Sequence, residues 1–362
     1  MFKKINVCRN NIWKRKISTR PHVVYDDQTN GFLSVFPDIV DTIFKSKCFI
    51  NNKQYKHHFL NVLEYTVMKE KRFRPPLLIE TYKILEKPEN LTKHNLQLMN
   101  ILAWIPEIIQ AYMNTEDDSM DQTDFRCDDV CWHKKDNVGL TSFRDCLYLY
   151  EVASLLLKKY FNKTPMYVPL TDLFHEMNQR LVIGQSLDWH WKVNEKLDFS
   201  KFNTHLFTTM GRNKGGFIII ETPFRASCIL SNNYSKFLKV KNLIERITYV
   251  FQVDNDVLDV FQNGTAKIDA GENIRQGQCT WMAVEVLENG SENLKKVFKE
   301  NYGRIGEEYE NKIIRIYYEM GLFDKYIRYK KETLEYINDS VSKMNDQPLQ
   351  EAILNLYKIM FL

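Results

Sequence analysis

Apolar residues recur at intervals of three and four along nearly the whole chain. This spacing is the period of an α-helix with one buried face, whereas the alternation typical of β-strands is nearly absent. The clearest stripe runs from Leu98 to Tyr112 and leads directly into Asp117, with Pro106 inside it. Similar spacing predicts further helices over residues 140–161, 170–190, 237–261, 307–320 and 349–361.

Polar and helix-breaking residues separate these segments at short loops, near residues 87–89, 128–139, 162–165, 264–271 and 346–348. None of the loops is long or low in complexity, and no repeat of solenoid length is present. We therefore expect an all-α protein in which residues 26–362 form one large helical bundle around a central cavity.

Two short acidic runs interrupt otherwise apolar helices. Their acidic and amide members are Asp117, Asp118 and Asp121 in the first run, and Asn255, Asp256 and Asp259 in the second. Side chains four residues apart lie on one face of a helix, so the first and last member of each run present two oxygens in one direction. Mg²⁺ prefers oxygen ligands and often bridges them to a diphosphate. A single run would more often mark a solvated face, but two of them predict a magnesium clamp across the cavity.

The charge distribution narrows the class of partner. The chain has 362 residues and a formal net charge of +4, but seven lysines and arginines precede the first acidic residue, Asp26. A nucleic-acid-binding protein normally carries its basic surface on the folded body, so we expect no nucleic acid partner. Residues 1–25 are typical either of a mitochondrial transit peptide or of a disordered basic tail. No apolar run reaches the length of a membrane span, and we expect a soluble protein of the mitochondria or the cytosol.

Other kinds of site fit the sequence poorly. The seven cysteines form no pairs at zinc-binding spacing, since Cys127 and Cys131 have no matching second pair. His175-Glu176 lacks the second histidine of a metalloprotease helix, and no glycine-rich phosphate loop is present. Reduced thiols and a metal clamp of oxygen ligands remain the simplest interpretation.

A series of short motifs runs along the chain in a fixed order. They are residues 70–74 (EKRFR), 117–121, Cys131-Trp132, residues 138–140, residues 184–188 (GQSLD), Lys214, Phe251-Gln252 ahead of residues 255–259, residues 279–281 and residues 301–303. In these residues the chain resembles the trans-isoprenyl diphosphate synthases, especially farnesyl diphosphate synthase, from about residue 35 to residue 360. The resemblance implies the all-α isoprenoid synthase fold, a homodimer, three magnesium ions and an allylic prenyl diphosphate substrate.

The resemblance also implies roles for individual side chains. Contacts to the allylic diphosphate would come from Arg126, Lys214, Gln252 and Lys267, and contacts to a second substrate, isopentenyl diphosphate, from Lys71, Arg74 and Gln110. Tyr112 and Met113 match the positions that limit chain length in the family. The bulky Tyr112 indicates a cavity for a farnesyl chain.

Several positions depart from the family pattern around the second-substrate site. Cys127-Asp128-Asp129 stands where the family has a second arginine followed by Gly-Gln. At about 5 Å and an effective dielectric near 20, each charge contact with a diphosphate contributes about 3 kcal/mol before screening. The C-terminal residues 357–362 are largely apolar where the family has a basic tail, and Asn255 is similar to the asparagine that begins a metal motif in terpene cyclases.

These departures predict an enzyme that ionises one substrate and no longer binds the second. We therefore expect a magnesium-dependent terpene synthase, a lyase that cyclises farnesyl diphosphate to a sesquiterpene and releases diphosphate. The alternative is a farnesyl or geranyl diphosphate synthase, a prenyltransferase, which the retention of Lys71, Arg74 and Gln110 favours. A catalytically silent dimer partner is a third hypothesis, against which the retained acidic ligands argue.

Overall fold

The computed structural model describes residues 27–47, 52–68, 74–127, 129–189, 192–193, 196–213, 215–262, 265–266 and 271–361. The all-α prediction is confirmed over these residues. The helix expected over 140–161 is observed at Ser142–Phe161, and the one expected over 237–261 at Tyr234–Val260. The basic N-terminal segment 1–25 lies outside the described residues, so the prediction of a leader stays a prediction.

The N-terminal half consists of helices joined by short turns. They are α2 (Asp27–Ser34), α3 (Phe36–Phe44), α4 (Lys53–Val62), the π-helical turn η2 (Leu63–Val67), α5 (Arg74–Leu85), η3 (Pro88–Asn90), α6 (Lys93–Asp121), η4 (Trp132–Lys134), η5 (Gly139–Thr141), α7 (Ser142–Phe161) and α8 (Tyr167–Trp189).

The C-terminal half continues in the same way. It contains η6 (Phe199–Lys201), α9 (Thr204–Asn213), the π-helical turn η7 (Phe217–Glu221), α10 (Thr222–Leu230), α11 (Tyr234–Val260), α12 (Glu272–Gln276), α13 (Trp281–Asn289), α14 (Glu292–Asn301), α15 (Glu307–Glu319), α16 (Leu322–Ser342) and α17 (Gln347–Phe361).

Strand structure in the described part of the chain is limited to antiparallel hairpins of two residues a side. They pair β1 (Phe125–Arg126) with β2 (Asp129–Val130), β3 (Lys192–Val193) with β4 (Lys196–Leu197), and β5 (Phe261–Gln262) with β6 (Thr265–Ala266). The first and third of these hairpins directly follow the two helices that carry the acidic runs.

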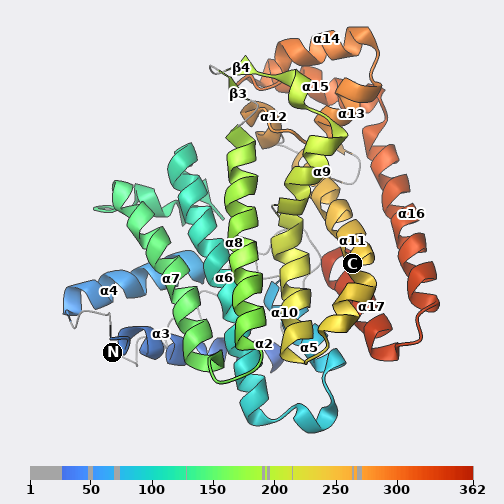
Figure 1. Ribbon diagram of the computed structural model, residues 1–362. Helices are drawn as coiled ribbons and strands as arrows, with labels where there is room; N and C mark the ends of the chain where they lie inside the picture. The colour runs from blue at the N-terminus through green and yellow to red at the C-terminus, as the bar shows by residue number, and fades with distance from the viewer. Residues whose placement is uncertain are drawn as a thin grey trace.

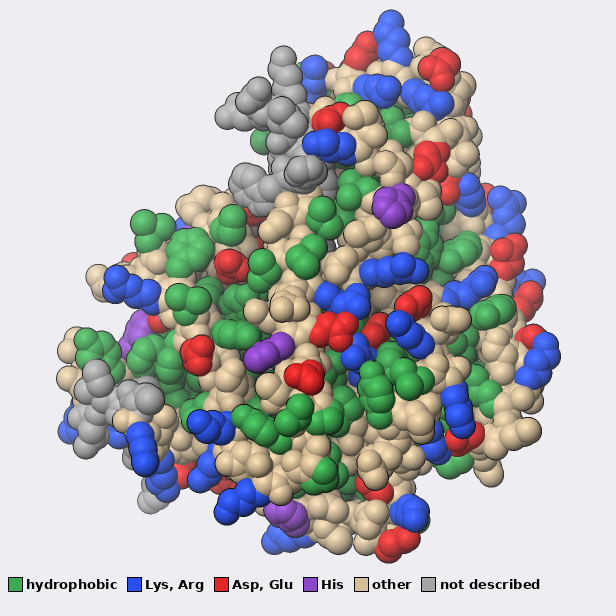
Figure 2. All heavy atoms as spheres, viewed as in Figure 1, with side chains coloured by type: hydrophobic (Ala, Val, Ile, Leu, Met, Phe, Trp, Pro, Cys, Tyr) green, Lys and Arg blue, Asp and Glu red, His purple; other side chains and the backbone are tan. Residues whose placement is uncertain are grey.

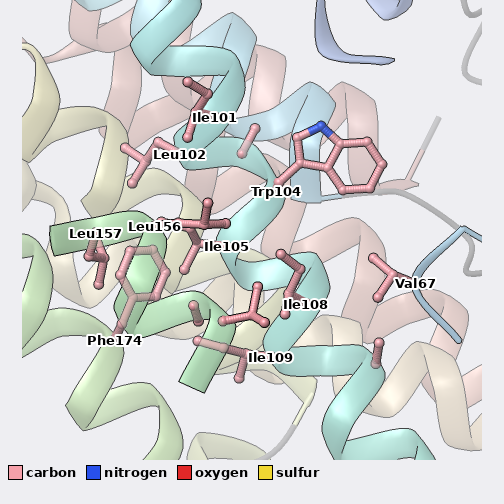
Figure 3. Packing of buried hydrophobic residues seen from close by; sticks show 14 of the residues in the cluster. Val67, Ile101, Leu102, Trp104, Ile105, Ile108, Ile109, Leu156, Leu157 and Phe174 are labelled. Atoms are coloured by element: carbon pink, nitrogen blue, oxygen red, sulfur yellow. The ribbon is translucent and has the colours of Figure 1, made fainter. Parts of the chain in front are cut away.

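Helix α6 is the centre of the largest apolar cluster. Thr92 caps its N-terminus by accepting a hydrogen bond from the Asn95 backbone N–H at 3.2 Å. Figure 3 shows Ile105 and Ile109 of α6 facing side chains of α7 and α8, among them Leu156 and Phe174, and all of these are at most 2% exposed. Because the helix is packed along its length, the acidic run in its last turns has a rigid base.

Helix α11 joins two further apolar clusters. Its N-terminal part packs with α5, α10, α16 and α17, whereas Val253, Val257 and Val260 pack with α9 and with α12 to α16. Figure 1 shows α12 to α15 gathered at one end of the molecule, and α16 and α17 along one side. Along α11 the change from one cluster to the other falls between Phe251 and Val253, so the second acidic run lies just after it, in the turns that pack with the second cluster.

The chain makes a close approach to α11 between α9 and η7. A Cβ atom added to Gly216 would lie 2.1 Å from Thr248 Cγ2 and 3.0 Å from the Thr248 carbonyl oxygen. Only glycine fits at this contact. The absent side chain lets the residues just before η7 approach the face of α11 that carries Gln252, which also lies near a Cβ built on Gly211 or Gly215.

None of the helices that the structure describes is long and apolar enough to cross a membrane. The helical content instead packs into the three apolar clusters, which contain most of the large aliphatic side chains.

The contact at Gly216 predicts a stability difference between two glycine variants. We expect Gly216→Ala to lower the free energy of unfolding by about 1–3 kcal/mol, the usual range for overpacking. Gly211→Ala is the matched control, because its added Cβ would lie at an ordinary 3.5 Å from Gln252 Cγ. Urea unfolding followed by circular dichroism measures both. Equal stability of the two variants would contradict the close approach.

Candidate active site

The first acidic run occupies the last turns of α6. Asp118 is only 4% exposed, and the Arg126 guanidinium of β1 donates hydrogen bonds to both of its carboxylate oxygens at 2.7–2.9 Å. Asp117 lies at the open side of the helix, where its Oδ1 accepts a hydrogen bond from the Gln185 amide of α8 at 2.6 Å. Asp121 is exposed at the end of the helix. The middle carboxylate is thus fixed within the protein, and the first and last lie on the more open face.

The second acidic run repeats this arrangement on α11. Asp256 is 5% exposed and accepts hydrogen bonds from the Trp281 backbone N–H at 2.7 Å and from the Gln252 amide at 3.1 Å. Trp281 begins α13, so the carboxylate lies at a helix N-terminus, which favours negative charge. Asn255 and Asp259 are half-buried, and Asp259 accepts a hydrogen bond from the Asn273 backbone N–H at 3.2 Å.

The donor set of the two runs suits Mg²⁺. Each run offers carboxylate or amide oxygens at positions four apart, and none of the six side chains is a soft sulfur or imidazole ligand. Within the described residues, no group of three or more His, Cys, Asp or Glu side chains could hold a metal ion by itself. Such a pairwise set fits ions whose remaining ligands come from a substrate diphosphate and from water, as Mg²⁺ prefers.

A partly buried polar row joins the start of α5 to α6, on the turns of α6 that precede the first run. Arg74, at the start of α5 and 3% exposed, donates through Nε to Glu107 at 2.5 Å and through Nη1 to Gln110 at 3.4 Å. Gln110 donates in turn to Asn114 at 2.7 Å. The structure therefore brings two of the predicted isopentenyl diphosphate contacts, Arg74 and Gln110, into one hydrogen-bonded row, while Lys71 lies outside the described residues.

A small pocket of about 40 Å³ lies between this row and the first run. Its walls include Asn114, Asp118, Arg126, Cys127 and Trp132. The volume suits a few water molecules rather than a prenyl chain. Burial, together with the nearby Asp118 carboxylate, raises the pKa of the Cys131 thiol on the same wall to about 12.

The predicted allylic diphosphate contacts are only partly described. Arg126 and Gln252 lie beside the first and second runs respectively, as the hydrogen bonds to Asp118 and Asp256 show. Lys214 and Lys267 fall outside the described residues. A Cβ built on Gly215 would lie 3.5 Å from Gln252 Oε1, so the chain at Gly215 lies close to the side chain that contacts the second run.

Tyr112 lies one helical turn before the first run and is 8% exposed. Its hydroxyl donates to Asn178 of α8 at 3.0 Å, and its ring meets the Tyr150 ring edge-on at 5.9 Å. Burial, followed by the charge of Glu116, raises the pKa of the Tyr112 phenol well above its usual range. Tyr112 therefore stays a neutral donor that links α6 to α8. Met113 is buried beside it at 3% exposure.

A model of the polyprenyl synthetase family matches residues 56–320, most of the chain. The chain belongs to the polyprenyl synthetase family. Among its relatives, farnesyl pyrophosphate synthase 2 of Arabidopsis thaliana is 26% identical over 90% of this chain and 96% of the relative. Farnesyl pyrophosphate synthase 1 of Cannabis sativa is 28% identical, over 89% of this chain and 94% of the relative. Geranyl diphosphate synthase of Ips pini is 26% identical, over 86% of this chain and 77% of the relative.

Solved structures confirm the fold of this polyprenyl synthetase. The farnesyl diphosphate synthase of T. brucei superposes with a TM-score of 0.85 at 20% identity, covering 92% of this chain and 99% of that one. The predicted all-α isoprenoid synthase fold is therefore correct.

The prediction of a sesquiterpene-forming terpene synthase, a lyase, is wrong. The relatives that match most of this polyprenyl synthetase are named farnesyl and geranyl diphosphate synthases, which favours the prenyltransferase alternative. The prediction gave too much weight to charge changes near Cys127. Cys127 and Asp129 are exposed on the β1–β2 hairpin, where water and salt screen a charge change.

Sequence reasoning missed several partners of the predicted side chains, and four of them show why. Gln185 lies within a recognised motif but had no assigned role, and Asn178 and Glu107 had no signal at all. The fourth partner is a backbone N–H, that of Trp281, which side-chain patterns cannot reveal. Each of these four contacts joins two different helices.

The cysteines predict a selective labelling pattern. Burial, as the largest cause, raises the pKa of Cys131, Cys146, Cys228 and Cys279 to about 12, so these thiols stay protonated and shielded at pH 8. Cys127 is exposed. Among these five, we expect iodoacetamide to modify Cys127 first in the native protein, as read by peptide mass spectrometry. Urea-unfolded protein, in which all five react, is the control, and equal native labelling of Cys131 would contradict the described burial.

Proposed function

We propose that this polyprenyl synthetase is a prenyltransferase that condenses isopentenyl diphosphate with an allylic diphosphate to give geranyl or farnesyl diphosphate. The observation that carries the proposal is the pairing of two like-built acidic runs with a separate row containing Arg74 and Gln110. A condensation needs one site for the leaving diphosphate and one for the second substrate. The names of the relatives, which include both farnesyl and geranyl diphosphate synthases, support this assignment.

We assign metal binding to the outer members of the two runs. Asp117, Asp121, Asn255 and Asp259 would hold Mg²⁺, with three ions as the proposed number. The bound ions would neutralise the allylic diphosphate and make it a better leaving group. Asp118 and Asp256 are engaged by Arg126 and by the Trp281 N–H, so their proposed role is to fix the turns that carry the ligands.

In this proposal the cationic and amide side chains are divided between the two diphosphates. Arg126, Lys214, Gln252 and Lys267 would contact the allylic diphosphate, and Lys71, Arg74 and Gln110 would contact isopentenyl diphosphate. Arg74 Nη2 supports this division, because it is buried and makes no hydrogen bond to the described residues. A diphosphate oxygen would give this nitrogen the acceptor that a buried donor normally has.

The reaction conserves atoms and charge. The allylic carbon–oxygen bond breaks and its electron pair leaves with diphosphate, and the isopentenyl double bond attacks the allylic carbon. Loss of a proton from the carbon next to the new cation restores a double bond, and a released diphosphate oxygen can accept that proton. The apolar lining contributed by α6 and α8 would exclude water, which would otherwise capture the cation.

Exposed apolar side chains on α7 and α8 support a homodimer. Leu147 on α7 is 66% exposed, and Val182 and Ile183 on α8 are 47% and 51% exposed. Figure 2 shows apolar side chains over α7 and α8 on the visible face. Exposed apolar surface of this kind commonly marks an interface.

For the location of the protein we keep mitochondria and cytosol as the two candidates. One relative is named mitochondrial farnesyl pyrophosphate synthase 1, which supports the first.

The deciding experiment supplies both substrates. Purified protein with Mg²⁺, isopentenyl diphosphate and either dimethylallyl or geranyl diphosphate should yield a longer prenyl diphosphate, detected by mass spectrometry. Reactions without isopentenyl diphosphate are the control. Volatile terpenes formed from farnesyl diphosphate alone, or no turnover with any substrate pair, would refute the proposal.

Removing one outer carboxylate should abolish most of the activity. We expect Asp117→Ala to lower kcat/KM by at least about 100-fold, since even outer-shell partners of metal ligands commonly contribute 10–100-fold. Asp124→Ala is the matched control, because Asp124 is a nearby exposed carboxylate paired with Lys134 at 3.1 Å. Steady-state kinetics with both substrates measures the effect, and comparable losses in the two variants would contradict the assignment.

The contact between Tyr112 and Asn178 predicts an effect on product length. Tyr112→Ala removes the ring that links α6 to α8, so we expect products longer than those of the wild type. Tyr112→Phe keeps the ring and removes only the hydroxyl, and we expect it to retain the wild-type product length. Mass spectrometry of the product diphosphates separates the two. An unchanged product from Tyr112→Ala would show that this ring does not limit the chain.

A further inference from the structure

A third carboxylate lies immediately before the second acidic run and faces away from it. Asp254 is 4% exposed and accepts hydrogen bonds from Lys330 Nζ at 2.8 Å and from the Tyr326 hydroxyl, both on α16. Tyr326 and Lys330 are one helical turn apart, so both reach Asp254 from one face of α16. The carboxylate is therefore engaged on the side of α11 that packs against its neighbouring helices.

The position of Asp254 on the helix relates it directly to the proposed ligands. Successive residues of an α-helix are rotated by about 100°, so the direction shared by Asn255 and Asp259 lies about a third of a turn from Asp254. A contact that fixes Asp254 also fixes the rotation of this turn about the helix axis. Rotation of the turn would swing both outer ligands together.

The network continues to the C-terminal end of the described chain. Lys330 Nζ lies 5.2 Å from the centre of the Phe361 ring, and that ring packs on Tyr357 at 4.9 Å, both on α17. A cation over an aromatic face is attracted to the electron-rich face of the ring. Figure 1 shows α16 and α17 beside α11. The apolar C-terminal residues thus hold Lys330 in place.

We propose that Asp254 is a positioning residue, which acts through Lys330 and Phe361 to hold Asn255 and Asp259 in the orientation that binds metal and diphosphate. This inference rests on the proposed function of the same site. A buried ion pair contributes little net stability, because desolvation offsets much of the attraction. We infer that the ion pair instead fixes geometry, because it connects the turn of α11 that carries the ligands to α16 and, through Lys330, to α17.

The test measures Mg²⁺-dependent binding of inorganic pyrophosphate by isothermal titration calorimetry, which requires no turnover. We expect Lys330→Met to weaken this binding by about 10-fold or more, which is a common loss when a residue that orients metal ligands is changed. Lys331→Met is the matched control, because Lys331 is the next residue on α16 and its side chain is 76% exposed. We expect this variant to bind pyrophosphate as the wild type does. Wild-type binding by Lys330→Met would overturn the proposal.

Two further variants keep the test independent of folding defects. Lys330→Met removes the cation that faces the buried Asp254 carboxylate, whereas Asp254→Asn combined with Lys330→Met removes both charges and should fold. We expect this double variant to show the same loss of pyrophosphate binding and a higher Mg²⁺ concentration for half-maximal activity. Phe361→Leu leaves the ion pair intact and should give a smaller loss. Tight binding by the double variant would overturn the positioning role.

The outcomes for the wild type separate this inference from the proposed function. Wild-type protein that binds pyrophosphate with Mg²⁺ but condenses no prenyl substrates would refute the prenyltransferase alone, and the variants would still decide the role of Asp254. Wild-type protein that binds no pyrophosphate with Mg²⁺ would overturn the positioning role.

Discussion

The burial of one carboxylate within each acidic run is the constraint on which the site depends. A buried carboxylate without partners would be strongly unfavourable, so each needs donors that are themselves fixed in place. Arg126 meets this need for Asp118, and the N-terminus of α13 meets it for Asp256. Once the middle carboxylate of a run is held, helix geometry alone determines where the outer side chains lie. The two runs solve the same problem with different donors, one a charged side chain and the other a backbone N–H.

Helix α11 packs in two apolar clusters, and this packing connects the second run to much of the C-terminal half. Its N-terminal part is packed against α5, α10 and α17, and its last turns against α13 and α15. The second run lies just after the boundary, in the turns that pack with the second cluster. A shift of the second cluster would therefore act on the run directly, and a shift of the first would act through the preceding turn of α11. Helix α6, in contrast, packs within a single apolar cluster, so the side chains of that one cluster position the first run.

Much of the fold could be predicted from the sequence because helical periodicity is a local signal. The stripe from Leu98 to Tyr112 predicted the body of α6, and the spacing of the acids predicted which face would hold oxygens. The donors that fix Asp118 and Asp256 could be anticipated only in part, since Arg126 is a nearby side chain but the Trp281 N–H is a distant backbone group. The wrong enzyme class was inferred largely from the residues around Cys127. Their exposure to solvent, which weakens the effect of a charge change, cannot be read from the sequence. Lys71, Lys214 and Lys267 stay predictions, because they lie outside the described residues.

The close contact between Gly216 and Thr248 also has an evolutionary consequence. The two positions share one small volume, since a methyl group on residue 216 would occupy the space of Thr248 Cγ2. A larger residue at either position is therefore disfavoured while the other position keeps its present residue. Among homologues that keep this helix crossing, a larger residue at the first position should be found together with a smaller one at the second. The two positions would then covary for reasons of volume, although neither side chain takes part in the chemistry.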